Sequence, residues 1–504
     1  MNNMKFRLPA LFLIVVALAT GAYQAPAQQA AYPHILTLAD AIGIAKTQSP
    51  DALIARQTFR KSYWEYRSYK ASNLPSLTLT ANVPSINQSI TPYMQRDSNR
   101  IFRVYAKTQS ISEDVNLALT QKIGITGGTI SINSSLSGNH DKSSPKLDPY
   151  LSVPVNIELN QPLFSYNAWR WDRRIKPLSY SLAKRKYLED CEQISITATE
   201  YFFNLLEAQI ENKIAMTNLK NYDTLYRIAK GRYQLGKIAE NDLLQLELSF
   251  LKAQAAVENA NLALDNAQFR FKSYLRLQDS LSVVLLPPAE INFAKINPDQ
   301  AVTLASDNSS TSLDFKKRLL EAASAVNFAK LDGRFDARLH ALVGLQQSGA
   351  TIPDTYVKPQ DQRQMSLGVT IPILDWGVAR GQIKMAQSQE EIVKNSVEQE
   401  VIDFKRNVYL KAVEFNMQQK QLTIAAKSDT VARKSYEVIK GRYLIGKINS
   451  ILDLNNAQME TDNAEKNYYF ALQTYWKSYF QIRKMTLFDF NRNEALRFDL
   501  QDVK

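Results

Sequence analysis

The sequence predicts a mixed α+β fold, mostly helical, in which two similar repeats each contain a long antiparallel coiled-coil hairpin and a few strands. A turn sequence, Lys-Gly-Arg-Tyr-x-x-Gly-Lys-Ile, begins at Lys230 and again at Lys440, 210 residues later (440 − 230). Apolar residues at alternating steps of four and three lead into and out of both copies, which is the pattern of helices packed along a partner. Stretches with a period of two separate the helical regions and indicate strands.

Both turn sequences also contain the G-x-x-x-x-G-K pattern of a nucleotide phosphate loop. That loop needs a preceding strand and a Ser or Thr after its lysine. Here a helical pattern precedes, and Ile238 or Ile448 follows. We therefore interpret both segments as hairpin turns, in which the glycines let the backbone take φ > 0 where a helix ends.

Residues 1–27 have the layout of a secretory signal peptide. Lys5 and Arg7 precede an apolar stretch at 11–19, and Ala25-Pro26-Ala27 provides the small residues that signal peptidase requires. The apolar stretch is short for a membrane span, which argues against the alternative of an N-terminal anchor. We expect the mature chain to begin near Gln28.

Composition narrows the classes of function. The 504 residues are 45% hydrophobic, which rules out general disorder. Beyond the N-terminus, no run of about 18 apolar residues could cross a bilayer as a helix. The formal charge of +12 is spread along polar helix faces, so we expect no nucleic-acid partner. Cys191 is the only cysteine and is interpreted as a buried apolar residue.

The histidines do not suggest catalysis. The three of them, His34, His140 and His340, are scattered and fit no metal-ligand spacing. His340 lies on the small-polar face of a predicted strand, where a solvated pore-lining residue is the simpler interpretation. We expect no enzyme activity and no cofactor.

Each predicted repeat begins with a helix, continues with strands and ends with a long hairpin. Strands are expected within 74–163 and 337–373, and hairpins at 166–277 and 376–486. The full division is a signal peptide at 1–27, a first repeat at 28–278, a second repeat at 279–490 and a polar C-terminal tail at 491–504. The first helix of the first repeat is broken or bent at Pro50.

The two repeats differ in length before their hairpins. Ala41 matches Ala301 at an offset of 260, whereas Pro162 matches Pro372 at an offset of 210. The first repeat therefore has 50 additional residues (260 − 210). They include two more alternating stretches, 115–123 and 130–136, which we interpret as an added hairpin, either in the wall that the strands form or beside it.

The predicted strands have two different faces. Leu77 and Leu79 alternate with Thr78 and Thr80, and similar patterns recur near 153–160, 339–345 and 366–371. Strands of about ten residues with one apolar and one small-polar face suit a barrel with lipid outside and water inside. A half-buried sheet of a soluble protein has the same alternation.

Several short motifs occur in the order of a known family. They are Leu36-Thr37-Leu38 with Pro50-Asp51, Leu74-Pro75-Ser76-Leu77, Gln161-Pro162-Leu163-Phe164, Pro372-Ile373-Leu374-Asp375-Trp376-Gly377, the two Gly-Arg-Tyr-x-x-Gly-Lys-Ile turns and Leu487-Phe488-Asp489-Phe490. Together with the duplication, they resemble the TolC family of outer-membrane efflux and secretion channels, particularly its Bacteroidetes-type members.

The resemblance implies a function and partners. Three chains would form a homotrimer with one β-barrel in outer-membrane lipid and a helical duct in the periplasm. The duct would export solutes passively from an inner-membrane pump of the RND or ABC type, through a periplasmic adaptor protein. The alternative is a periplasmic coiled-coil adaptor or scaffold without a membrane barrel, which would share the signal peptide and the heptads.

The resemblance also implies site residues at the hairpin tips. Adaptor docking would involve Arg232, Tyr233, Gly236, Lys237, Arg442, Tyr443, Gly446 and Lys447. Asp453, with Asp242 as its counterpart in the first repeat, is the candidate for an acidic constriction. One residue is inserted before Asp453, and the neutral Asn455 and Asn456 follow it, so helix capping by Ser450 and Asp453 is the alternative interpretation.

Overall fold

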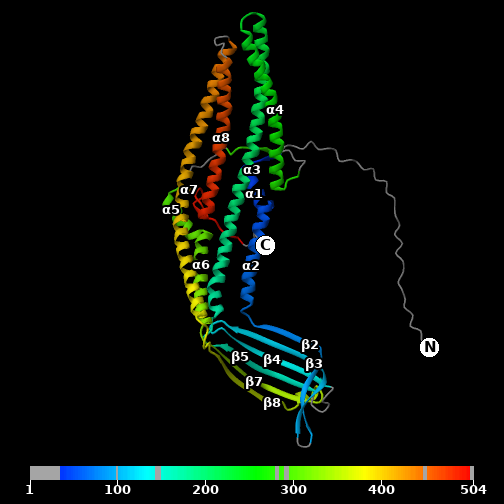
Figure 1. Ribbon diagram of the computed structural model, residues 1–504. Helices are drawn as coiled ribbons and strands as arrows, with labels where there is room; N and C mark the ends of the chain where they lie inside the picture. The colour runs from blue at the N-terminus through cyan, green and yellow to red at the C-terminus, as the bar shows by residue number, and fades with distance from the viewer. Residues whose placement is uncertain are drawn as a thin grey trace, which may run out of the picture.

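The computed structural model describes residues 34–97, 100–141, 149–278, 283–288, 295–445 and 451–499. The expected signal peptide, Gly446, Lys447 and the end of the tail lie outside these residues. The molecule is elongated, with long helices at one end and a six-stranded sheet at the other (Figure 1). Among the described residues, no helix combines the length and the apolar character needed to cross a bilayer.

Two helical hairpins of matching dimensions confirm the predicted duplication. The first consists of α3 (Ala168–Gln234) and α4 (Glu240–Leu275), and the second of α7 (Val378–Leu444) and α8 (Ile451–Thr486). Both first helices have 67 residues and both second helices have 36. At about 1.5 Å per residue, the longer helices extend about 100 Å. The connection at 445–450 is one residue longer than that at 235–239, which locates the inserted residue in the second turn.

The glycines of the turn sequence have different conformations. Gly236 has φ +64° with no atom near its missing Cβ, and its N–H donates to the carbonyl oxygen of Tyr233. This confirms its predicted role in ending a helix. For Gly231 and Gly441 that prediction is wrong, because both lie within the last helical turns before the bend.

Short helices precede the strands of both repeats. They are α1 (Leu38–Gln48) and α2 (Pro50–Ala71) in the first repeat, and α5 (Pro298–Asn308) and α6 (Ser310–Asp332) in the second. Ser49 ends α1 and caps the N-terminus of α2, with Pro50 at the first helical position. Ser309 does the same between α5 and α6. The predicted break at Pro50 is confirmed.

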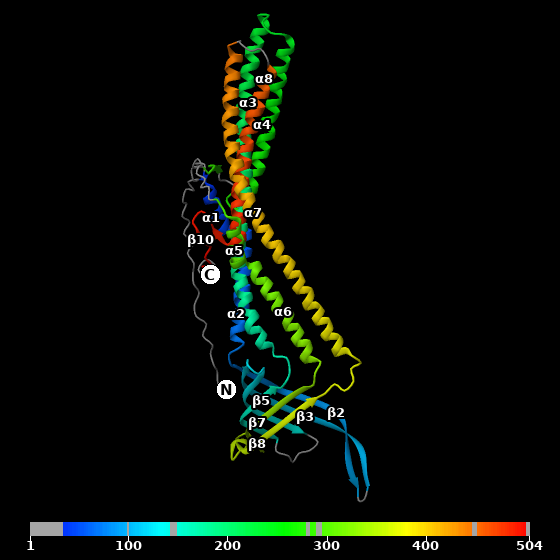
Figure 2. The ribbon, with the colours of Figure 1, turned by 90° about the vertical axis from the view of Figure 1, so that its left-hand side faces the viewer.

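The additional residues of the first repeat lie in the sheet. Its strands are all antiparallel in the order β2-β3-β4-β5-β7-β8, with bounds β2 (Ser76–Asp97), β3 (Arg100–Ile123), β4 (Gly128–Asp141), β5 (Tyr150–Pro162), β7 (Asp336–Gly349) and β8 (Gln360–Thr370). The expected length of about ten residues is wrong for β2 and β3, which have 22 and 24 residues. β4 pairs with β3 only from Ser110 onward, so β2 and β3 extend beyond the end of β4 as a two-stranded ribbon (Figure 2).

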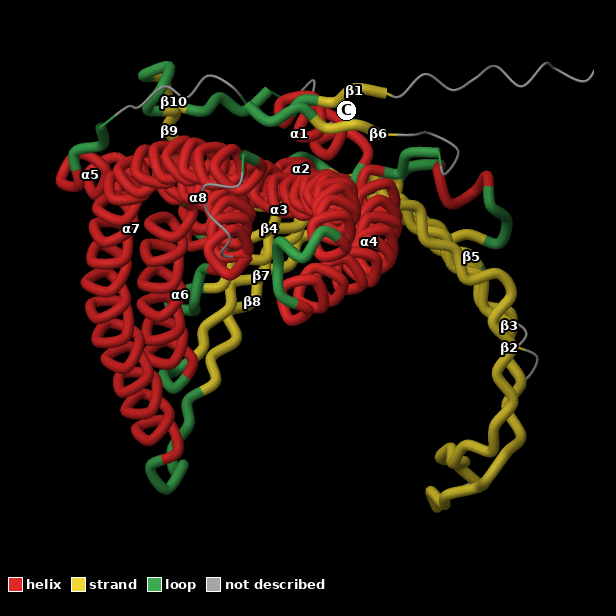
Figure 3. The backbone as a smooth tube through the Cα atoms, turned by 90° about the horizontal axis from the view of Figure 1, so that it is seen from above, coloured by secondary structure: helices red, strands yellow, loops and turns green. Residues whose placement is uncertain are grey.

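The helices form a curved row one layer thick (Figure 3). Near the tips the packing order is α4-α3-α8-α7, and near the sheet it is α2-α3-α6-α7. Buried residues on these helices, including Phe202, Phe415 and Tyr475, form the main core. The side-chain amide of Asn212 in α3 donates to that of Asn261 in α4 at 2.6 Å, and such a pair fixes the register of two helices.

Smaller elements lie on the convex side of the helical row (Figure 3). The parallel pair β1 (His34–Leu36) and β6 (Val283–Leu285) joins the starts of the two repeats. β9 (Phe488–Asp489) pairs with β10 (Glu494–Ala495). The tail then returns to α2, where the Phe498 ring lies 4.8 Å from that of Phe59. The described part of the polar tail is therefore attached to the helices through Phe498, while most of its other residues are exposed.

Candidate functional site

One face of the sheet is apolar and the other is polar across all six strands. Exposed apolar side chains occur on every strand and include Leu77, Leu117, Ile132, Ile157, Val343 and Leu367. None of the described residues covers that face, which is the arrangement expected for contact with lipid and not for a half-buried soluble sheet. The opposite face carries the small polar residues that the alternation predicted.

The polar face contains a hydrogen-bonded group centred on Glu158 of β5. Its carboxylate accepts from Asn160 at 2.7 Å and from Asn133 of β4 at 3.2 Å, and its Oε1 lies 3.0 Å from His340 Nε2 of β7. Asn133 also donates to Asn156 at 3.0 Å. Three adjacent strands thus share one polar network, and His340 lies on the face where the sequence placed it.

The two hairpin tips contact each other through Arg232. Its guanidinium donates to the carbonyl oxygen of Leu444 at 3.0 Å and, at 3.5 Å, to that of Tyr443. The guanidinium carbon lies 5.5 Å from the centre of the Tyr443 ring, within the range of a cation–π interaction. Arg232 therefore links the last turn of α3 to the last turn of α7.

Equivalent tyrosines at the two tips have opposite environments. Tyr443 is 2% exposed and packs with Leu225, Leu246 and Leu454, whereas Tyr233 is 41% exposed. Burial raises the pKa of the Tyr443 phenol, Arg232 opposes that rise and Asp242 adds to it. The first tip therefore provides both the cation and the carboxylate that act on the second tip's tyrosine.

The remaining predicted docking residues that the structure describes are all exposed to solvent. Tyr233, Gly236, Lys237 and Arg442 are exposed at the end of the molecule farthest from the sheet. The backbone N–H of Lys237 donates to the carbonyl oxygen of Arg232 at 2.9 Å. These four residues therefore present two cationic side chains and one aromatic ring to solvent.

The two candidate gate carboxylates lie in the first turns of α4 and α8. Asp242 is half-buried beside Tyr443, whereas Asp453 is exposed. Acidic residues at these positions also interact favourably with the helix dipole. Ser450, the other half of the predicted capping pair, lies outside the described residues.

Sequence reasoning missed Asp462 of α8, about two turns farther from the tip. Asn218 donates to its carboxylate from α3 at 2.7 Å, and Gln458 donates at 2.9 Å. Burial raises the pKa of this carboxyl group despite both hydrogen bonds. The repeat contains the signal that could have found it, because Asp462 stands where the first repeat has the apolar Leu251 (462 − 211).

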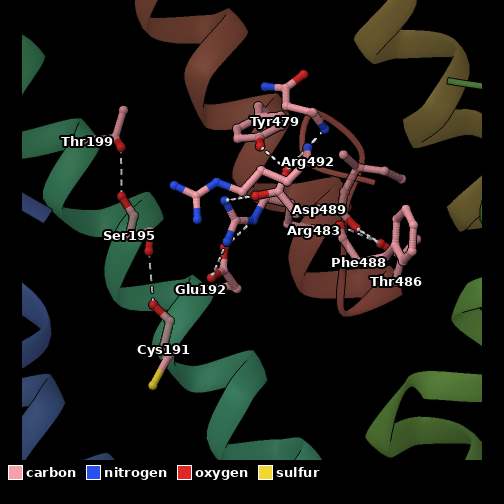
Figure 4. Close-up of polar contacts among 12 residues, drawn as sticks. Cys191, Glu192, Ser195, Thr199, Tyr479, Arg483, Thr486, Phe488, Asp489 and Arg492 are labelled. Atoms are coloured by element: carbon pink, nitrogen blue, oxygen red, sulfur yellow. Dashed lines mark hydrogen bonds and ion pairs between the residues drawn. The ribbon is translucent and has the colours of Figure 1, made fainter. Parts of the chain in front are cut away.

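A buried ionic cluster joins α3 to the end of α8 (Figure 4). Glu192 is 2% exposed and pairs with Arg483 at 3.1 Å and with Lys46 of α1 at 3.3 Å. Arg483 also pairs with Asp489 at 3.1 Å, which accepts from the Tyr479 hydroxyl at 2.6 Å. Burial acts to raise the pKa of Asp489, but the Tyr479 hydrogen bond and the Arg483 charge hold it below its usual value.

Neither Cys191 nor the acidic residues suggest a chemical centre. Cys191 is half-buried in α3, less than predicted, and burial raises the pKa of its thiol, which disfavours the reactive thiolate. In the described part of the chain, no three His, Cys, Asp or Glu side chains are placed to bind a metal ion.

A single-layer helical wall that continues into a two-faced sheet defines a segment of a membrane-anchored conduit. The profile of the outer membrane efflux protein family matches residues 41–275 and 338–486. The chain therefore belongs to the outer membrane efflux protein family, and its place is the outer membrane. Among curated protein sequences, none matches it.

Solved structures of outer-membrane channels share the fold. The Campylobacter jejuni CmeC outer membrane channel is 16% identical with a TM-score of 0.64, over 93% of this chain and 89% of CmeC. VceC from Vibrio cholerae is 12% identical with a TM-score of 0.62, over 89% and 95%. The open state of the Neisseria gonorrhoeae MtrE channel is 14% identical with a TM-score of 0.59, over 89% and 88%. The resemblance to TolC-type channels is confirmed, and the alternative of an adaptor without membrane-facing strands is wrong.

Proposed function

We propose that three copies of this chain form an export duct that serves as the outer-membrane component of a tripartite efflux or type I secretion system. Solute enters at the hairpin tips from an inner-membrane pump of the RND or ABC type, passes between the helical walls and leaves through the barrel. The duct itself supplies no energy and no chemistry. Membership of the efflux family and the two-faced sheet support this function.

The observation that carries the assembly is a pair of apolar stripes at the two free edges of the helical wall. On α7, Leu410, Met417, Ile424, Val431 and Val438 recur every seven residues and are 48–64% exposed. On α4, Leu248, Ala255, Leu262 and Phe269 have the same spacing and are exposed. A heptad stripe of this kind is typical of a helix that packs on another helix.

Both stripes face away from the chain's own core. Met417 and Ile424 each follow a buried residue, Phe415 and Leu422, by two positions. Two residues correspond to about 200° around a helix. Leu248 and Leu262 are related in the same way to the buried Leu246 and Ala260. The α4 edge of one copy and the α7 edge of the next can therefore cover each other and continue the curved wall.

We place adaptor docking at the exposed tip residues Tyr233, Gly236, Lys237 and Arg442, together with Gly446 and Lys447. Arg232 and Tyr443 hold the two tips of a chain together, and Asp453 and Asp242 form the acidic entrance. Docking opens the duct if the adaptor binds the separated tips more tightly than the joined tips.

The test combines assembly with docking. A photo-crosslinking amino acid at Tyr233 or Arg442 should capture the adaptor hairpin in cells, and the same probe at Lys330, which is exposed at the sheet end of α6, should not. Substitution of Ile424 by Asp should abolish the trimer, whereas substitution of the exposed Lys420 by Asp should not. Trimers that export normally but crosslink equally at Lys330 and Tyr233 would contradict the tip assignment.

A further inference from the structure

The two repeats connect their helices to the sheet differently. In the second repeat, α6 leads into β7 and β8 leads into α7, so two adjacent strands join two adjacent helices. In the first repeat, α2 leads into β2 and β5 leads into α3, and these helices also contact each other. The strands β2 and β5, however, are separated in the sheet by β3 and β4. The insertion therefore widens the sheet without adding a helix.

The inserted strands have the same two faces as their neighbours. Their apolar residues Leu117, Leu119, Ile130 and Ile132 are 38–44% exposed on the side that carries Leu77 and Val343. Their polar residues face the other side, where Asn133 donates to both Asn156 and Glu158 of β5. A hairpin packed beside the sheet would not be expected to continue both of its faces. The inserted strands β3 and β4 are therefore part of the wall.

The two edge strands of the sheet have directions that allow them to pair with each other between copies. In an antiparallel sheet of six, the outermost strands β2 and β8 run in opposite directions. Among the described residues, each has a strand partner on one side only. In a membrane such edges must be closed, since lipid cannot satisfy their backbone groups. Placing β8 of one copy beside β2 of the next keeps the antiparallel order.

The width of the sheet also matches the width of the helical wall. Six strands about 4.8 Å apart, tilted by about 40°, cover an arc of about 38 Å. The four helices of the row, about 9–10 Å apart, cover about 36–40 Å. With four strands per chain the arc would be only about 25 Å at the same tilt.

We infer that three chains close a barrel of eighteen strands, six from each, through three β8–β2 seams between copies. This inference rests on the proposed trimeric duct and specifies how many strands form its barrel and which strands pair between copies. The resulting diameter is about 36 Å, against about 24 Å for the twelve strands that an uninserted chain would give. Such a barrel takes solutes as wide as the helical duct admits, so the sheet end does not select by size. Glu158 and His340 from each copy form a polar belt inside it.

Cysteine pairs in a Cys191→Ser background test the order of the strands. Asn133→Cys with Asn156→Cys lie directly opposite on β4 and β5 and should form a disulfide within the chain, because opposite antiparallel residues are 4.5–5.5 Å apart. Pairs from Thr78, Thr80 and Asn82 of β2 with Gln364, Ser366 and Gly368 of β8 should instead link different copies, giving dimers and trimers on denaturing gels.

The competing arrangement has β2 next to β5, with the inserted hairpin outside the wall. Thr80→Cys with Glu158→Cys or Asn156→Cys should not react in the eighteen-stranded wall, since β2 and β5 are three strand spacings apart, about 14 Å. Trimers in which this pair reacts and the β2–β8 pairs do not would overturn the eighteen-strand inference while leaving the proposed duct intact. A chain that forms no trimer in the outer membrane would instead overturn the proposed duct.

Discussion

Removing the guanidinium of Arg232 should separate the two tips of a chain. Arg232→Ala deletes the 3.0 Å hydrogen bond to Leu444, the longer contacts to Tyr443 and the cation–π contact. A hydrogen bond to a charged group contributes about 1.5–3 kcal/mol, and a partly exposed cation–π contact about 0.5–1 kcal/mol. Because Arg232 is half-exposed, we take the lower end, about 2 kcal/mol per chain. That corresponds to roughly 30-fold in the ratio of separated to joined tips.

Single-channel recording in planar bilayers measures the consequence. If tip separation opens the duct, Arg232→Ala should raise the open-to-closed ratio by at least about 30-fold, which is the factor for one of the three chains. Arg442→Ala, the equivalent change at the exposed second tip, is the matched control and should shift it less than about twofold. Equal effects of the two variants, or an unchanged ratio for Arg232→Ala in intact trimers, would refute the role of the Arg232 contact.

Three further outcomes follow from local contacts. Arg483→Met should cost about 3–5 kcal/mol, since it removes the cation that two buried carboxylates, Glu192 and Asp489, share, and should lower the thermal midpoint far more than Lys484→Met. Because folding lowers the pKa of Asp489, its contribution to stability is full above the unfolded value of about 3.9 and is lost as the pH falls through the lower folded pKa. Limited proteolysis should therefore show the tail released on acidification, and tail release at the same pH in Asp489→Asn and the native chain would contradict this. Gly236→Ala should cost about 1 kcal/mol because of its positive φ, whereas Gly231→Ala, within a helix, should stabilise by about 0.5–1 kcal/mol; equal denaturation midpoints would disprove the assigned conformations.

The sequence by itself determined the features that depend on local periodicity. A heptad repeat and a glycine turn are properties of a short stretch, so both hairpins and the break before Pro50 were predicted from it. Alternation likewise identified the two faces of the strands, with His340 on the polar one. The duplication also revealed the residue inserted near the second tip, because two copies of one pattern can be compared position by position.

Only the tertiary structure decided how distant segments meet. Tyr233 and Tyr443 are equivalent in sequence, yet Tyr233 is exposed and Tyr443 is buried. The difference arises because α3 packs against α8 in the middle of the row, where Arg232 lies over the Tyr443 ring. Alternation showed that the 50 additional residues are strands, but only pairing partners put them inside the sheet. The Glu192 cluster joins residues nearly 300 positions apart, and no local pattern records which charges such a fold buries together.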